Sequence, residues 1–220
     1  MIKIINLTIK CENNIIFKKI NFFLKKKTYV MIGNNGIGKS TLLKSFIKDE
    51  NYFFIGEIIF NKTNILLYKT DYIARMGVFF TYQNSLEIHN IKNIFFLKTC
   101  YNIFNYNNFY FFKILKFYIK NINFKKKLLY RMYNYGFSGG EKKKNEFLFL
   151  LIINPMFILL DEIDSGLDYN SIIFIYNYLN IIKNKKYIII ISHNKNIKNI
   201  LLIDYYLIIK KNKINFLSCI

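Results

Sequence analysis

The stretch that decides the fold reads Gly33-Asn34-Asn35-Gly36-Ile37-Gly38-Lys39-Ser40-Thr41. It matches the pattern G-x-x-x-x-G-K-[S/T], with an apolar strand expected before it (Tyr29–Ile32) and helical apolar spacing after it (Thr41–Ile47). In such a loop, backbone N–H groups and the positive end of the helix converge on phosphate oxygens. We therefore predict that these nine residues bind ATP, that Lys39 reaches its β- and γ-phosphates, and that Ser40 contributes a hydroxyl to Mg²⁺.

The rest of the chain alternates strand-like and helix-like segments, which favours an α/β fold with a mainly parallel sheet. Apolar runs such as Phe157–Leu160 and Tyr187–Ile191 are typical of strands that are buried on both faces. Further strands are expected over Ile2–Ile9, Ile15–Phe23, Gly56–Phe60 and Val78–Thr81, a closing hairpin over Tyr205–Ile209 and Lys213–Leu217, and helices up to Ile153 and over Tyr169–Ile182. We expect one domain over residues 1–220, with a catalytic core at 1–89 and 136–220 and a helical subdomain at 90–135.

Four polar residues follow expected strands and are candidates for the chemistry. Asp161 ends a buried strand, where a carboxylate orients Mg²⁺ through water, and Glu162 is placed to act as general base on the attacking water. His193 follows another strand and is a candidate contact of the γ-phosphate, the alternative being a strand-end histidine capped by backbone. Gln83 is a candidate ligand of Mg²⁺ or the water, the alternative being a surface glutamine.

A second anion-binding site is predicted at Ser138-Gly139-Gly140-Glu141, because a serine and two glycines directly precede an apolar helix. One ATP molecule does not need two such sites on one chain. The economical interpretation is that this site faces the γ-phosphate held by a second subunit. The active site is then expected to form only in a head-to-tail pair of chains.

The order of these motifs resembles that of the ABC ATPases over nearly the whole chain. Gly33–Thr41 resembles Walker A, Gln83 the Q-loop, Phe137–Glu141 the signature, Phe157–Asp161 with Glu162 Walker B, Ser165–Asp168 the D-loop, and His193 the switch histidine. The resemblance implies an ATP-hydrolysing nucleotide-binding domain with a RecA-like core, an antiparallel β edge and a helical subdomain.

Within that family the chain resembles the SufC branch, the ATPases of the SUF iron–sulfur cluster assembly machinery. Gly136–Glu146 is similar to GFSGGEKKRNE, Leu160–Asp168 to LDE-x-DSGLD, and Tyr82-Gln83 followed by Leu86-Glu87-Ile88 to FQ-x-P-x-EIP. Asn34-Asn35 and Lys144 depart from the branch pattern, and residues 90–135 match it weakly. The resemblance implies docking on SufB/SufD-like scaffold proteins, ATP-dependent dimerisation, and no iron bound by this subunit.

Two further hypotheses concern single residues. Lys143 lies one to two turns past the signature on the helix that leads back to Walker B, so it is a candidate to pair with Glu162 and withhold the base; a surface lysine without a partner is the alternative. Phe17 is a candidate for stacking on adenine.

Three other functions are compatible with parts of the sequence. The ATPase subunit of a membrane transporter shares the fold and chemistry. A nucleic-acid-associated ABC protein is disfavoured, because the net charge of +20 comes from lysines scattered along a chain whose Asn, Ile, Phe and Tyr content indicates AT-rich codons. A non-hydrolysing binding module is disfavoured because Lys39, Asp161, Glu162 and His193 are all present.

The composition also bounds the compartment. Cys11, Cys100 and Cys219 form neither a C-x-x-C pair nor an even set, so we expect free thiols in a reducing compartment. The longest apolar run, Phe147–Leu160, contains Asn154 and Pro155 and is too short for a transmembrane helix. Residues Met1–Ile9 already alternate like a strand, so no targeting peptide is expected. These features predict a soluble protein of the cytoplasm or an organelle (plastid) stroma.

Overall fold

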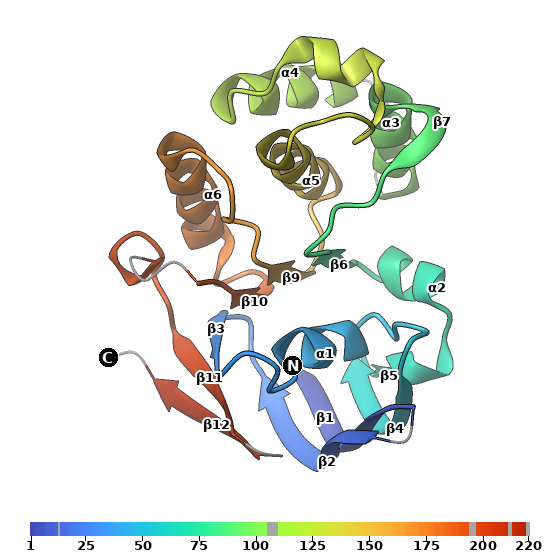
Figure 1. Ribbon diagram of the computed structural model, residues 1–220, viewed down its shortest axis with the longest axis vertical. Coiled ribbons are helices and arrows are strands. Elements are labelled where there is room, and N and C mark those ends of the chain that lie inside the picture. Colours follow the sequence, from blue (N-terminus) through green and yellow to red (C-terminus); the bar gives the residue numbers. More distant parts are fainter. Residues whose placement is uncertain (13, 105–109, 194–196, 211–212, 219–220) are drawn as a thin grey trace.

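The computed structural model describes residues 1–12, 14–104, 110–193, 197–210 and 213–218 (Figure 1). Its main sheet has six strands in the order β12-β11-β3-β10-β9-β6. The neighbours from β11 to β6 are all parallel, and β12 closes the edge antiparallel to β11. The strands are β3 Thr28–Ile32, β6 Val78–Thr81, β9 Phe157–Asp161, β10 Tyr187–Ile191, β11 Tyr205–Lys210 and β12 Lys213–Ser218.

Every residue of β9 and β10 is buried, as their uninterrupted apolar sequences predict for strands covered on both faces. Parallel strands end at the same edge of a sheet. The loops after β3, β6, β9 and β10 therefore leave from one edge, and they carry the phosphate loop, Gln83, Glu162 and His193 respectively.

A second, antiparallel sheet has the order β2-β1-β4-β5. Its strands are β1 Ile2–Cys11, β2 Asn14–Leu24, β4 Phe53–Phe60 and β5 Thr63–Asn64. Figure 1 shows helix α1, Lys39–Ser45, beside this sheet and below the main one. One hydrophobic core joins the three parts, and within it the ring of Phe157 lies 5.1 Å from Phe46 and 5.9 Å from Phe60, centroid to centroid.

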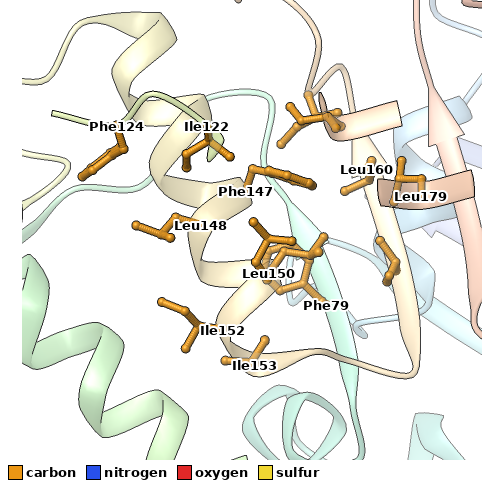
Figure 2. Close-up of a cluster of buried hydrophobic side chains, with 14 of the residues drawn as sticks. Phe79, Ile122, Phe124, Phe147, Leu148, Leu150, Ile152, Ile153, Leu160 and Leu179 are labelled. Atoms are coloured by element: carbon orange, nitrogen blue, oxygen red, sulfur yellow. The ribbon is translucent and has the colours of Figure 1, made fainter. Parts of the chain in front are cut away.

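A second core surrounds helix α5, Gly139–Ile153, on the other face of the main sheet. Figure 2 shows the α5 side chains Phe147, Leu148, Leu150, Ile152 and Ile153 among Phe79, Leu160, Leu179, Ile122 and Phe124. Because α5 is buried on several sides, its apolar residues do not form a single stripe. Each fully buried large apolar side chain of this kind contributes about 1.5–3 kcal/mol relative to exposure.

Residues 90–135 hold the helices α3, Asn93–Phe104, and α4, Phe111–Asn121, both packed against α5, and the 3₁₀ turn η3, Lys126–Tyr130. Two short strands at the ends of this region, β7 (Ile88–Lys92) and β8 (Met132–Tyr133), pair antiparallel and were not expected from the sequence. Asn93 and Asn134, which directly follow these strands, form with Asn145 of α5 a fully buried chain of side-chain hydrogen bonds of 2.7 and 2.8 Å. This polar chain joins the inserted region to α5.

The remaining elements are helix α2, Thr70–Arg75, helix α6, Tyr169–Ile182, and the 3₁₀ turns η1, Ile65–Leu67, and η4, Ile197–Asn199. Helix α6 and strands β6 and β10 have the predicted bounds, and the predicted closing hairpin is β11–β12. Helix α1 begins two residues earlier than predicted and ends two residues earlier. Helix α2 was missed because its six residues carry almost no apolar periodicity.

Candidate functional site

The phosphate loop Gly33–Thr41 connects β3 to α1, as predicted. Gly38 is the N-cap of α1 and has a positive φ of 101°. A Cβ at this position would lie 2.8 Å from Ile16 Cγ2 and 2.9 Å from Phe17 Cε2. Glycine is therefore required here both by the backbone conformation and by the close approach of strand β2. Asn34, Asn35, Gly36 and Ile37 form the loop itself, and Ser40 and Thr41 lie in the first turn of α1.

Lys39 points back into this loop. Its Nζ donates to the carbonyl oxygens of Gly33, at 2.7 Å, and Asn34, at 3.1 Å, and the residue is only 9% exposed. The ammonium group is thus fixed inside the ring of loop backbone and beside the N-terminus of α1. A fixed cation at a helix N-terminus is an arrangement that favours polyphosphate binding.

Asp161 and Ser40, the two residues predicted to serve Mg²⁺, lie near enough to each other for the Ser40 hydroxyl to act on the Asp161 carboxylate. The Asp161 amide donates to Thr81 Oγ1 at 2.9 Å, which fixes the end of β9. Burial raises the pKa of Asp161, which is 2% exposed, and the Ser40 hydroxyl opposes that rise.

A divalent cation fits this pair. Asp161 Oδ1 is buried and has no hydrogen-bond partner among the described residues, so it is an acceptor that still needs a positive neighbour. The described ranges contain no group of three His, Cys, Asp or Glu side chains able to hold a metal. A cation here would therefore take most of its ligands from phosphate oxygens and water, which is how Mg²⁺ is usually held.

Three predicted catalytic residues from three loops meet beside this pair. Glu162 Oε1 lies 3.1 Å from His193 Nε2, and Gln83 Nε2 donates to Glu162 Oε2 at 3.3 Å. Glu162 has a positive φ of 52°, its amide donates to the Ile191 carbonyl at 2.9 Å, and its own carbonyl accepts from the Ser165 hydroxyl at 2.9 Å. The carboxylate is thus placed by a left-handed turn that its neighbours hold in position.

The predicted second anion site lies at the start of α5. Ser138 is the N-cap, and its side chain and that of Glu141 form a capping box. Glu141 also accepts from Lys125 Nζ at 2.7 Å, and this bond, with that from the Ser138 amide, lowers the pKa of Glu141 to about 2. A Cβ on Gly139 would meet no heavy atom within 4 Å, whereas one on Gly140 would lie 2.8 Å from the Gly166 carbonyl oxygen.

Within one chain the structure does not bring this second site to the phosphate loop. The cavity at the signature is lined by Ser138, Gly140 and Glu141 together with Lys125, Lys144 and Asp168. A separate cavity is lined by Gly33, Lys39 and His193, and the two share no lining residue. The predicted site residues therefore form two groups: the phosphate loop with Gln83, Asp161, Glu162 and His193, and the signature with its flanking lysines.

Two sequence hypotheses are wrong. Lys143 does not pair with Glu162: its Nζ donates to the carbonyl oxygens of Tyr82 and Gln83, at 2.9 and 3.2 Å, and lies 3.7 Å from Glu146. The lysine is 5% exposed, so it is not a surface residue either. Phe17 cannot offer a face to adenine, because it is fully buried against Gly38.

Sequence reasoning missed residues that support the site without carrying its chemistry. Thr81 holds the backbone of Asp161, and Asp164 accepts hydrogen bonds from Tyr176 and Ser192. Thr81 ends a predicted strand two residues before Gln83, a position that could have drawn attention. No comparable signal marks Tyr176 in a chain with 18 tyrosines.

Comparisons with known proteins find similarity over most of the chain. A family model described as "ABC transporter" matches residues 17–165. The chain is 32% identical over 224 residues to the "Probable ATP-dependent transporter ycf16" of Cyanophora paradoxa, covering 97% of this chain and 86% of that protein. It is 35% identical over 207 residues to a "Probable ABC transporter ATP-binding protein" of Streptococcus pyogenes, covering 90% and 81%.

Solved structures share the fold at low sequence identity. The ATP-binding subunit of an ABC transporter superposes with a TM-score of 0.84 at 17% identity, covering 99% of this chain and 90% of that one. A dimeric ATP-binding cassette in a post-hydrolysis state with ADP and phosphate superposes with a TM-score of 0.80 at 18% identity, covering 99% and 98%. The predicted fold class, an ABC-type nucleotide-binding domain, is confirmed. Over the described ranges, no helix has the length and apolar character needed to cross a membrane.

Proposed function

The chain belongs to the ABC transporter family and is an ATPase, and from that premise we propose that it drives conformational change in a SufB/SufD-like scaffold for iron–sulfur cluster assembly. The observation that carries this proposal is the pair of stretches Gly136–Glu146 and Leu160–Asp168, which resemble the SufC branch. The structure packs the two together: Lys144 Nζ lies 2.7 Å from Asp168 Oδ1, and Gly140 faces the carbonyl oxygen of Gly166.

The proposed reaction is hydrolysis of ATP to ADP and phosphate. Water attacks the γ-phosphorus, the bond from phosphorus to the β–γ bridging oxygen breaks, and Glu162 accepts the proton of the water. Gln83 and His193 hold the Glu162 carboxylate through the 3.3 and 3.1 Å contacts. Lys39 and the backbone of Gly33–Thr41 bind the β- and γ-phosphates. Ser40 and Asp161 would hold Mg²⁺, which neutralises phosphate charge when it is bound.

We propose further that the site is completed by a second copy in a head-to-tail dimer. The support is the separation of the two cavities within one chain and the open space beside Gly139. A Ser-capped helix N-terminus with nothing packed on Gly139 offers backbone N–H groups to an incoming γ-phosphate. The dimer therefore accounts for both anion sites with two ATP molecules and two chains.

A partner surface is available on and beside the β7–β8 pair. Leu86, Ile91, Phe95, Met132 and Tyr135 are large apolar side chains that are exposed there. Leu86 is also joined to the buried asparagine chain, because Asn134 Nδ2 donates to its carbonyl oxygen at 2.8 Å. A scaffold that covers this surface would be mechanically connected to Gln83, three residues from Leu86. The reducing cytoplasm or an organelle stroma suits free thiols at Cys11 and Cys100.

A membrane transporter remains the second candidate, favoured by the family description and by the names of the relatives. Capture of the tagged chain from native extract distinguishes the two. We expect a SufB/SufD-like scaffold without membrane helices among the captured proteins, whereas an integral membrane protein would overturn the proposal. Phe95→Asp should abolish capture and leave basal hydrolysis intact. Ile181→Asp, a matched change at a side chain that is 78% exposed on α6, should leave both unchanged.

A further inference from the structure

Three side chains from separate segments form a hydrogen-bonded group behind the catalytic loops. Asp164 lies in the turn after β9, Tyr176 on α6, and Ser192 directly after β10. Tyr176 Oη donates to Asp164 Oδ2 at 2.8 Å, and Ser192 Oγ donates to the same oxygen at 2.6 Å. Tyr176 is fully buried and Asp164 nearly so. Nothing in the proposed reaction uses this group directly.

The group joins the two loops that carry the reacting side chains. Asp164 is two residues beyond Glu162, and Ser192 immediately precedes His193. Glu162, Asp164, Ser165 and His193 line one small cavity. A displacement of the Asp164 turn relative to Ser192 would therefore change the 3.1 Å contact between Glu162 and His193.

The backbone conformation of Glu162 makes the contact between Glu162 and His193 strongly dependent on the position of the Asp164 turn. Its left-handed conformation is costly for a residue with a side chain, so the surrounding contacts must impose it. On one side its amide is bound to Ile191, and on the other its carbonyl is bound by Ser165 within the Asp164 turn. Holding that turn against β10 is what keeps the carboxylate of Glu162 directed at His193.

The hydroxyl donors of Tyr176 and Ser192 are needed because the Asp164 carboxylate has no ion pair with a described lysine, arginine or histidine. Among the ion pairs of the described residues none includes Asp164, so hydroxyl groups stabilise its buried charge. A buried carboxylate that loses a donor must find another or become exposed. Removing one hydroxyl donor is therefore expected to displace the turn that carries Asp164 and not only to lower the stability of the fold.

We propose that Asp164, held by Tyr176 and Ser192, is a positioning residue that keeps Glu162 and His193 in register for hydrolysis. Tyr176 extends the same connection to α6, whose N-cap Asp168 pairs with Lys144 on the signature helix. The inference rests on the ATPase chemistry of this site and does not depend on which partner the chain drives.

The test compares two isosteric changes on one helix. Tyr176→Phe removes the donor, whereas Tyr178→Phe removes a hydroxyl for which no hydrogen bond is found among the described residues. With Mg²⁺-ATP and the full chain, Tyr176→Phe should lower kcat about tenfold and leave the KM for ATP within about twofold. Tyr178→Phe should change neither, and both variants should melt near the wild-type temperature.

A second measurement separates positioning from loss of structure. In a Glu162→Gln background Tyr176→Phe should cause no further loss of the residual rate, because the group acts through Glu162. If Tyr176→Phe does not fold, Ser192→Ala removes the other donor and should give the same kcat-specific loss. Unchanged kcat in the folded variants, or equal losses with and without Glu162, would overturn the proposal.

Discussion

Replacing Gly140 by alanine places a methyl group against the backbone of the D-loop. The added Cβ would lie 2.8 Å from the Gly166 carbonyl oxygen, closer than such atoms approach without displacement. Gly139 is the matched control, since it is the preceding residue of the same helix and its Cβ would meet nothing within 4 Å. The two variants therefore carry the same substitution one residue apart in the first turn of α5, and they differ in this contact.

The magnitude follows from two opposing terms. Alanine gains up to about 1 kcal/mol over glycine in a helix, and this gain applies to both variants. Overpacking against a fixed backbone costs about 1–3 kcal/mol and applies only at Gly140. Gly140→Ala should therefore be about 1–3 kcal/mol less stable to unfolding than Gly139→Ala, which should equal or exceed the wild type.

Urea unfolding of the two purified variants, followed by circular dichroism, measures this difference directly. Equal stabilities, or a more stable Gly140→Ala, would refute the close packing of the signature helix on the D-loop. The hydrolysis rate should not follow the stability. Gly139→Ala should keep its fold but lose turnover, because its methyl group faces the side on which the phosphate of a second copy is proposed to bind. Full activity of Gly139→Ala would refute that part.

Two other predictions concern single side chains. Burial raises the pKa of Asp161, so its carboxyl becomes protonated at a higher pH than an exposed aspartate, and only the ionised form receives a cation. Turnover should therefore fall as the pH drops through that raised pKa, and a tenfold higher Mg²⁺ concentration should move this acid limb to lower pH. A pH–rate profile that does not change with the Mg²⁺ concentration would contradict this prediction. Lys143→Met keeps the aliphatic stem but leaves the carbonyl oxygens of Tyr82 and Gln83 without their donor, so kcat should fall about tenfold. The control is Lys142→Met, which removes only the exposed ion pair with Glu87 and should keep kcat within about twofold of the wild type. Steady-state assays of the two variants decide this, and equal rates would count against a role of Lys143 in holding Gln83.

Periodicity and motif spacing were sufficient to predict the strands of the main sheet and its mainly parallel character. The strand–loop–helix around Gly33–Thr41 and the apolar runs of β9 and β10 are local patterns, and each specifies its element without knowledge of the rest. The meeting of Gln83, Glu162 and His193 was also predictable, because all three follow strands that end at one edge of a parallel sheet.

Contacts between distant polar residues were not predictable in the same way. A chain rich in asparagine, lysine and tyrosine gives no signal that Asn93, Asn134 and Asn145 are buried together or that Lys143 points to carbonyl oxygens instead of Glu162. Such contacts depend on how α5 is rotated against its neighbours, which a low apolar asymmetry leaves undetermined. The burial of Phe17 could not be predicted for the same reason, since it depends on how β2 packs against the phosphate loop.

The central claim is that each active site combines the phosphate loop of one copy with the signature of another. Mixing two inactive variants tests it: Glu162→Gln, which lacks the base, and Ser138→Arg, which blocks the signature. A mixed dimer holds one intact site, so random pairing of equal amounts should restore about a quarter of the wild-type ATPase rate. A mixture no more active than the sum of its two separate components would contradict the claim.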